Sequence, residues 1–329
     1  MKVMTCKEAA LRWRISQRRV QELCAQGRIS GVRRTGRMWQ IPVESQKPVN
    51  PRFSSKMGKN PYWREFFLLD RCLILFEDVE HMIEKTTDRL RKKQLIGEIA
   101  YMRGNFQQAV KCVDGLAEDS PGFLNALAVS TAAKVGMGDM RSFQKSWNHL
   151  KRLHNKYKNQ DEVCKMIEVI QGVLSISAYA PQHCPSWIKE GVIDGLSEPF
   201  RMMALYLRAK SLLALGRIDE LVSTVEAALS LNISGWGIQE VYLYIILAHG
   251  YIYQEKPEKA HDMLLHALSI CMPHGFISPM AESISSLLGM GEKCLRKAYP
   301  QFLSLVLSLH RQLSPSWLEI HNMLTHEKI

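Results

Sequence analysis

The sequence predicts a mainly α-helical protein made of a small basic unit and a much larger helical body. Of its residues, 46% are hydrophobic and 23% are charged, a globular balance that favours packed cores over disorder. From residue 62 onward apolar residues recur with the 3.6-residue period of a helix. The first 45 residues differ, because two short helical patterns are followed by two runs typical of strands. We therefore expect an N-terminal domain over 1–45, a linker over 46–61 and a helical domain over 62–329.

The net charge of +11 is concentrated at the start of the chain. Of the 43 basic and 32 acidic residues, 14 and 3 lie within 1–59, which leaves 29 of each for the rest. A local positive field of this kind suits a polyanion, either nucleic acid or an anionic membrane surface. The alternative is a merely soluble basic tail, but such tails do not usually carry patterned apolar residues.

A capping box predicts where the first helix begins. In Thr5-Cys6-Lys7-Glu8 the threonine side chain can cap the amide three residues on, and the glutamate can reach back. The apolar face of this helix comprises Ala9, Ala10 and Trp13. Arg14-Ile15 forms the expected turn, and Ser16 is the N-cap candidate of a second helix.

The second helix, Gln17 to Gln26, is expected to separate an apolar face from a polar one. Its apolar residues fall at i, i+3 and i+4 and would pack on the first helix: Val20, Leu23 and Cys24. The outward face then carries Arg18, Gln21 and Glu22, with Arg19 at its flank and Gln17 in the first turn. Gly27 ends the helix.

Two short β segments follow, Ile29 to Arg34 and Met38 to Ile41, with a tight turn at Thr35-Gly36. Trp39 and Ile41 alternate with Met38 and Gln40, so one face of this hairpin is apolar. Three arginines crowd its tip: Arg33, Arg34 and Arg37. Pro42 stops the second strand.

Helix, tight turn, helix and basic hairpin together make a winged helix-turn-helix plan. The second helix of such a unit enters the major groove, where Gln and Arg can make bidentate contacts to purine edges. A hairpin tip rich in arginine can grip phosphates or the minor groove. The candidate DNA-binding residues are Gln17, Arg18, Arg19, Gln21, Arg33, Arg34 and Arg37. The alternative for the helix residues is a solvated face without a ligand.

Residues 3–45 also resemble the excisionase/MerR-type helix-turn-helix domain. The resemblance rests on four segments that occur in the family's order and spacing: Thr5–Ala10, Ile15–Leu23, Gly27–Ile29 and Gly31–Pro42. It implies DNA binding by the second helix and the wing. The segment 46–61 that follows has three prolines, a glycine and four basic residues without an acid, so it is expected either to lie along DNA or to serve as a plain tether.

Degenerate internal repeats mark the body. Tyr101–Ala109 recurs 34 residues later as Val135–Phe143, and Leu213–Leu221 recurs 39 residues later as Ile252–Ala260. In the second pair alanines stand seven residues before and twelve after each turn: Ala209, Ala228, Ala248 and Ala267. Small residues at these positions let paired helices approach closely. Five aromatic residues are interpreted as core rather than as a ligand cage: Trp236, Tyr242, Tyr244, Tyr251 and Tyr253.

This pattern resembles tetratricopeptide repeats over residues 95–270. The resemblance implies an α-solenoid of helical hairpins with a concave surface for a peptide, protein or ligand. The body also resembles the helical sensor region of large LuxR-type, MalT-like bacterial activators, in Ala281–Gly289, Cys294–Pro300 and Trp317–Leu324. Those proteins carry a C-terminal DNA-binding module, whereas this sequence ends at Ile329, so the DNA reader here would be the N-terminal unit.

Motifs of catalysis and cofactor binding do not stand out. There is no Walker motif and no GxSxG, and Gly136-Met137-Gly138 follows a helical pattern rather than a strand. We therefore expect no enzyme activity, no cofactor and no metal. The eight cysteines are scattered without a CxxC pair, which predicts buried thiols in a reducing compartment. The longest apolar run, Val241–Ala248, is too short to cross a bilayer, so we expect a cytoplasmic bacterial protein that is not bound to a membrane.

These observations predict a sequence-specific transcriptional regulator that binds double-stranded DNA, with a helical body that binds an effector or a protein partner. One small winged unit buries too little surface for tight specific binding, so we expect a homodimer. Two alternatives stay open. One is an excisionase-like recombination accessory factor, which the large body disfavours. The other is a helical-repeat interaction scaffold with a basic N-terminal arm. Absence of DNA binding would favour this scaffold, whereas DNA affinity that falls steeply with added salt would favour the regulator or the recombination factor.

Overall fold

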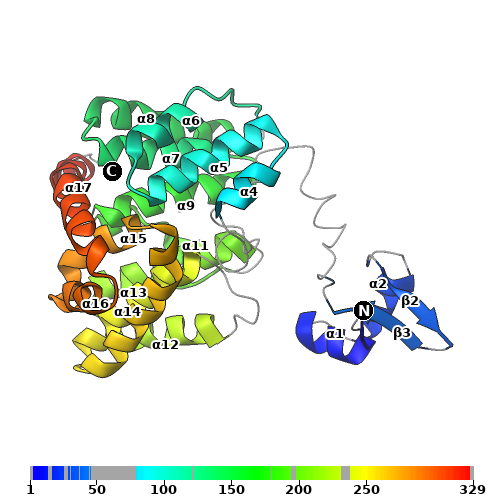
Figure 1. Ribbon diagram of the computed structural model, residues 1–329. Coiled ribbons are helices and arrows are strands. Elements are labelled where there is room, and N and C mark those ends of the chain that lie inside the picture. Colours follow the sequence, from blue (N-terminus) through cyan, green and yellow to red (C-terminus); the bar gives the residue numbers. More distant parts are fainter. Residues whose placement is uncertain are drawn as a thin grey trace. The chain divides into compact units, whose positions relative to one another are not determined.

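The computed structural model describes residues 3–13, 17–25, 29, 31–36, 38–43, 45, 79–120, 122–178, 180–193, 198–230 and 238–326. The chain divides into two compact units, Met1–Asn60 and Pro61–Ile329, which are described separately. The described residues are mainly helical, as the sequence predicts (Figure 1). The expected linker over 46–61 lies outside them.

The first unit combines two helices with a small antiparallel sheet. The helices are α1 (Cys6–Trp13) and α2 (Gln17–Ala25), and the strands are β1 (Val3–Met4), β2 (Arg33–Thr35) and β3 (Met38–Pro42). The sheet order is β1-β3-β2. Strand β1 is absent from the sequence expectations, because two residues are too few to show an alternation. The sequence also predicts that the first strand of the hairpin begins at Ile29. In the structure Gly31 has a φ of +72° and forms a turn, so β2 begins only at Arg33.

The capping box and the two apolar faces of this unit are confirmed. The Thr5 amide donates to Glu8 Oε2 at 2.6 Å, and the Glu8 amide donates to Thr5 Oγ1 at 3.3 Å. These bonds from Thr5 hold the pKa of Glu8 below its ordinary value. The core of the unit includes Ala9 and Trp13 from α1, and Val20, Leu23 and Cys24 from α2. Ile41 from β3 is fully buried among them.

The second unit is built from helices that pack on their neighbours along the chain. Its elements are α4 (Val79–Lys85), α5 (Arg89–Met102), α6 (Phe106–Val113), α7 (Phe123–Gly136), α8 (Met140–Lys156), α9 (Asp161–Ser177), η2 (Pro181–His183), α10 (Ser186–Glu190), α11 (Glu198–Ala214), α12 (Ile218–Ser230), α13 (Ile238–Tyr253), α14 (Pro257–Cys271), η3 (Met272–His274), α15 (Ser278–Ala281), η4 (Ile284–Leu287), α16 (Met290–Ala298) and α17 (Pro300–His326). The four alanines expected at close helix contacts, in α11 to α14, are all buried.

Four turns of the body share one geometry, and they lie where the internal repeats predict them. They join α5 to α6, α7 to α8, α11 to α12 and α13 to α14. At each, the same position has a positive φ: +76° at Gly104, +72° at Gly138, +69° at Gly216 and 57° at Glu255. The amide of the next residue bonds the carbonyl five positions back, as from Asn105 to Ala100 at 2.8 Å. This is the Schellman motif, which satisfies carbonyls at a helix end.

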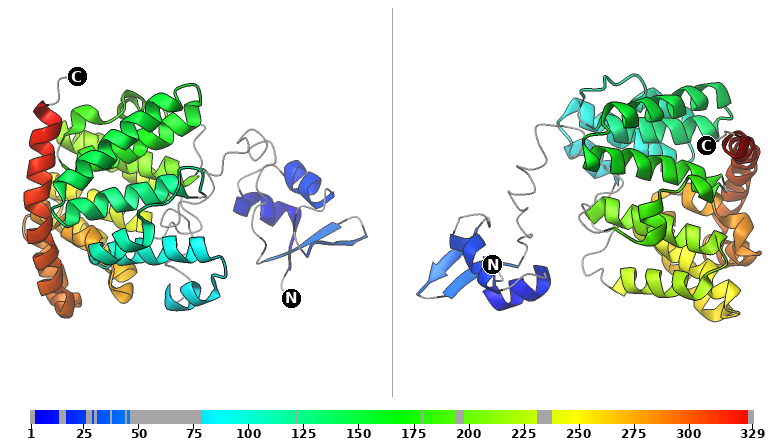
Figure 2. Two further views of the ribbon diagram at one scale, coloured as in Figure 1. Left: turned by 90° about the horizontal axis from the view of Figure 1, so that it is seen from above. Right: turned by 180° about the vertical axis from the view of Figure 1, so that it is seen from behind.

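The long helix α17 lies across the ends of several earlier helices (Figure 2). Gln312 Nε2 donates to the Gly136 carbonyl at 2.6 Å, and His321 Nδ1 donates to the Ala178 carbonyl at 3.0 Å. These carbonyls belong to the ends of α7 and α9, where intrahelical donors run out. Helix α17 therefore supplies side-chain caps to helices more than a hundred residues away in sequence.

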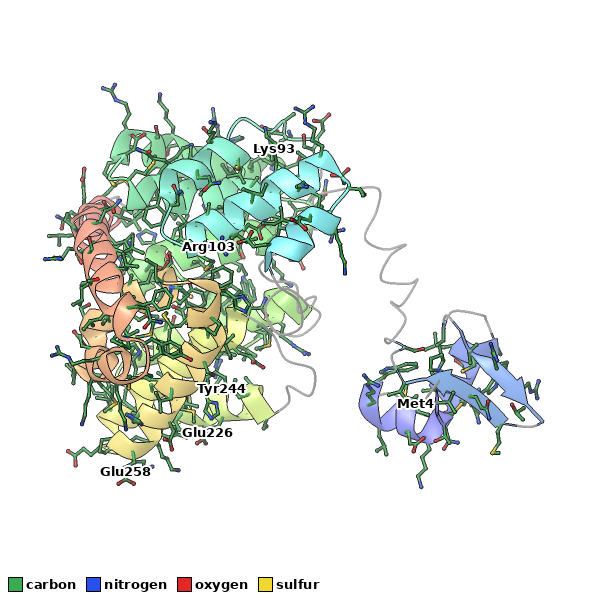
Figure 3. All side chains as sticks on the ribbon, viewed as in Figure 1. Met4, Lys93, Arg103, Glu226, Tyr244 and Glu258 are labelled. Carbon is green, nitrogen blue, oxygen red and sulfur yellow. The ribbon has the colours of Figure 1, made fainter. Side chains whose placement is uncertain are left out.

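The end of α5 is joined directly to η3 and α15, which lie more than 170 residues later in the sequence. Ser278 Oγ donates to the Tyr101 carbonyl at 2.6 Å, and Arg103 Nε donates to the His274 carbonyl at 3.1 Å. Arg103 also pairs with Glu80 of α4 at 2.8 Å. Figure 3 labels Arg103 at the end of α5. Helix α5 thus contacts α15 as well as its neighbour α6.

Candidate nucleic-acid interface

The outward face of α2 presents three of the candidate side chains. Gln17, Arg18 and Gln21 are exposed, because the opposite face of the helix is buried against α1. The Arg18 side chain is 89% exposed, and its Nε lies 3.5 Å from Glu22 Oε1. An ion pair between solvent-exposed groups is weak, so it can be exchanged for a phosphate or a base edge at little cost.

The hairpin presents two more candidates, Arg33 and Arg34, and both are exposed. In the β2–β3 register Arg34 stands opposite Trp39, and Arg33 stands opposite Gln40. Because successive side chains of a strand leave opposite faces, these two arginines point away from each other. The Arg34 guanidinium lies 5.4 Å from the centroid of the Trp39 ring, a cation–π contact that orients it.

Five of the seven candidates therefore occupy exposed positions on one compact unit. The remaining two lie outside what is described: the Arg19 side chain and the whole of Arg37. The expected turn at Arg14-Ile15 and the expected helix end at Gly27 are likewise outside. The unit Met1–Asn60 carries the entire excess charge of +11, since Asn60 adds none to the count for 1–59.

The thiols of this unit are structural groups. Cys6 and Cys24 are both buried in its core. Burial raises the pKa of the Cys24 thiol to about 12, with Cys6 as a further cause, and burial raises that of Cys6 as well. A thiol with a raised pKa is a poor nucleophile, so neither cysteine is suited to covalent chemistry.

A second group of polar side chains lies inside the body. Tyr101 Oη donates to Glu282 Oε1 at 2.7 Å, and Tyr242 Oη donates to Glu282 Oε2 at 2.9 Å. The Tyr206 and Tyr242 rings stand 5.3 Å apart, and Lys210 Nζ is 5.8 Å from the Tyr206 ring centre. This group therefore connects α5, α11 and α13 with the segment after α15.

Burial dominates the electrostatics of this internal group. It raises the pKa of Glu282, against the lowering effect of the two tyrosine bonds and of Lys210. It lowers the pKa of Lys210 to about 8, although Glu282 opposes that shift. The pKa of His249 falls to about 3 through burial and the nearby Lys210, so His249 is neutral at pH 7. Its Nε2 lies 2.7 Å from Ser286 Oγ.

The sequence did not reveal this internal group, because Tyr101 and Glu282 are 181 residues apart. Of the aromatic residues interpreted as core, Tyr251 is buried and bonds Glu226, while Tyr242 and Tyr244 are half-buried. Tyr253 contradicts the interpretation, since it is 60% exposed at the last position of α13. Trp236 lies outside the described residues.

Two further observations concern the described residues alone. No three His, Cys, Asp or Glu side chains among them come together in a way that could hold a metal ion. No helix among them is both long enough and apolar enough to span a membrane.

Comparison of the chain with family models, with curated proteins and with solved structures gives no match.

Proposed function

We propose that this chain is a sequence-specific, DNA-binding transcriptional regulator whose first unit is a winged helix-turn-helix. The observation that carries the proposal is that the net positive charge of the chain and its exposed candidate arginines belong to the same unit. The whole excess of +11 belongs to a unit in which Arg18, Arg33 and Arg34 stand exposed. Duplex DNA is a dense polyanion, and neutralising its phosphates releases counterions, which favours such a surface.

Each element has its own role in this proposal. Helix α2 enters the major groove, where Arg18 and Gln21 reach base edges from its exposed face. Arg33 on β2 binds backbone phosphate. Arg34 is turned toward Trp39, which supports the hairpin from its core face. Sequence preference therefore resides in α2, and sequence-independent affinity resides in the hairpin.

The body is proposed to be an α-solenoid of tetratricopeptide-like hairpins that binds an effector or a protein partner. The support is the recurrence of one Schellman turn at four equivalent positions, from Gly104 to Glu255. A homodimer is proposed because a single winged unit buries only about 600–1,000 Å² of protein surface on DNA. Analytical ultracentrifugation of the full chain, with and without its duplex, tests this state.

The experiment for DNA binding uses the full chain and a pool of random duplexes. Selection of bound duplexes followed by a retardation assay is expected to yield an enriched sequence. In the Arg18→Ala variant the sequence preference should relax. In the Arg33→Ala variant affinity should fall equally for all sequences, and the slope of log K against log salt should fall by about 1.

The control is a variant that removes the same charge elsewhere. Arg141 and Arg311 are exposed residues of the body. The double variant Arg141→Ala/Arg311→Ala should retain retardation, whereas Arg18→Ala/Arg33→Ala should lose it with an unchanged helical circular-dichroism signal. Failure of the wild-type chain to retard any duplex at low ionic strength would exclude the proposal.

A further inference from the structure

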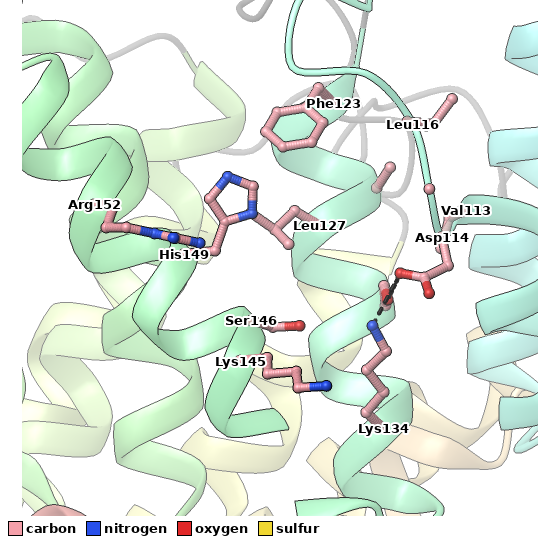
Figure 4. Close-up of a pocket in the computed structure, with 13 residues that line it drawn as sticks. Val113, Asp114, Leu116, Phe123, Leu127, Lys134, Lys145, Ser146, His149 and Arg152 are labelled. Carbon is pink, nitrogen blue, oxygen red and sulfur yellow. Dashed lines mark hydrogen bonds and ion pairs between the residues drawn. The ribbon is translucent and has the colours of Figure 1, made fainter. Parts of the chain in front are cut away.

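A pocket of about 320 Å³ opens between the first two helical hairpins of the body. It is lined by the end of α6, by the loop that follows, by α7 and by α8. Figure 4 shows Lys134 and Lys145 at one end of the pocket, Phe123 and Leu116 at the other, and Arg152 beside His149 on α8. The volume is at the lower end of the range for small-molecule sites.

The lining of the pocket carries more positive charge than its one carboxylate balances. Asp114 is the acidic residue of the lining, and its Oδ1 accepts bonds from Lys134 at 2.9 Å and from Ser130 at 3.0 Å. Within the described part of the chain, Lys145 and Arg152 have no ion pair. Lys145 also interacts electrostatically with Asp139 at the start of α8, so the charge of Arg152 and part of that of Lys145 are left to face the pocket.

The walls are held in place before any ligand binds. His149 Nε2 lies 3.0 Å from Glu118 Oε1, and its ring stands 5.8 Å from the Phe123 ring. Glu118 also accepts a bond from Lys156 at 2.6 Å, and both partners hold its pKa below the ordinary value. These contacts hold the loop between α6 and α7 against α8, so this loop loses little conformational entropy when a ligand binds.

We infer that this pocket binds a small organic anion, in which a carboxylate or phosphate group is joined to an apolar body. The anionic group pairs with Arg152 or with Lys145, which lie two turns apart on α8, and the apolar part packs on Phe123 and Leu127. The existence of the site stands on the pocket alone. Its role as the effector site of a regulator rests on the proposed function.

The test uses calorimetry on the full chain without DNA, so loss of DNA binding leaves its result unaffected. The probes are phenyl phosphate, benzoate, inorganic phosphate and benzyl alcohol. Phenyl phosphate or benzoate should bind at one site, and both should bind more tightly than inorganic phosphate and neutral benzyl alcohol. Equal binding of inorganic phosphate and phenyl phosphate would overturn the apolar part of the inference. No heat from either aromatic anion at millimolar concentration would overturn the whole.

The matched variants remove two cations from the pocket or two from nearby surface. Because both cations are exposed, Lys145→Ala/Arg152→Ala should weaken binding of the aromatic anions by roughly two- to fivefold for each side chain that pairs with them. Arg141→Ala/Lys158→Ala removes the same charge from exposed positions outside the pocket and should leave binding unchanged. All four side chains are exposed, so folding should survive in both variants, as checked by circular dichroism. Equal loss in the two variants would show a diffuse charge effect and refute the site.

Discussion

The four equivalent turns of the body predict that substitutions at the position of positive φ change stability in opposite directions, depending on whether they introduce or remove glycine. Glu255 has a φ of 57°, where the other three turns have glycine. A side chain in the left-handed region costs roughly 1–2 kcal/mol, while glycine costs roughly 0.5–1 kcal/mol in chain entropy. Since Glu255 is exposed, its side chain contributes little else. Glu255→Gly should therefore stabilise the body by about 0.5–1 kcal/mol.

The reverse change at the other turns should destabilise to different extents. A Cβ at Gly216 would meet no atom within 4 Å, so Gly216→Ala should cost only the strain, about 1 kcal/mol. A Cβ at Gly104 would lie 2.9 Å from Leu309 Cδ2 of α17. Gly104→Ala should add an overpacking cost of about 1 kcal/mol or more to the strain.

Urea unfolding of the full chain, followed by far-ultraviolet circular dichroism, measures these free energies. For a unit of this size about 1 kcal/mol corresponds to a shift of roughly 2–4 °C in Tm. The expected order of stability is Glu255→Gly, wild type, Gly216→Ala and then Gly104→Ala. A Glu255→Gly variant less stable than wild type, or a Gly216→Ala variant equal to it, would refute the shared-turn reasoning.

Three further predictions concern the cap and the internal polar group. Thr5→Ala removes the side-chain acceptor of the Glu8 amide, and it should cost about 1 kcal/mol, seen as faster hydrogen exchange in α1. Because the pKa of Glu282 is raised in the folded state, its stabilising contribution is present at low pH and is lost as the pH rises through that pKa. The Glu282→Gln variant should therefore gain stability relative to wild type when the pH is raised from 4 to 8. A difference in the free energy of urea unfolding that stays constant over this range would contradict the prediction. Lys210→Met should stabilise the body at pH 7 by on the order of 2 kcal/mol, discounted for residual solvent contact, and the gain should shrink between about pH 8 and the ordinary lysine pKa of 10.5.

The features that the sequence predicted are those that neighbouring residues determine. The Thr5–Glu8 box, the buried face of α2 and the turns at Gly104 and Gly138 each depend on a few consecutive side chains. Of the candidate interface, the exposure of the α2 residues followed from helical periodicity. The opposed directions of Arg33 and Arg34 needed the strand register as well.

The features that the sequence did not predict depend on partners far along the chain. Strand β1 exists because β3 pairs with it, and two residues carry no periodic signal of their own. The Glu282 group and the caps supplied by α17 join residues more than a hundred positions apart. The pocket between the first two hairpins needs the loop after α6 to close one side, which periodicity cannot show.

The bonds between α5 and the region of α15 affect how the helical body should unfold. A row of hairpins that touches only its neighbours can gain or lose a member at either extremity, and its outermost members fray first. Here the Tyr101 hydroxyl and carbonyl are bonded by residues that follow the last of the four repeated hairpins, Glu282 and Ser278. These bonds tie the first hairpin to a segment that follows the last one, so the two outer hairpins should be protected against fraying.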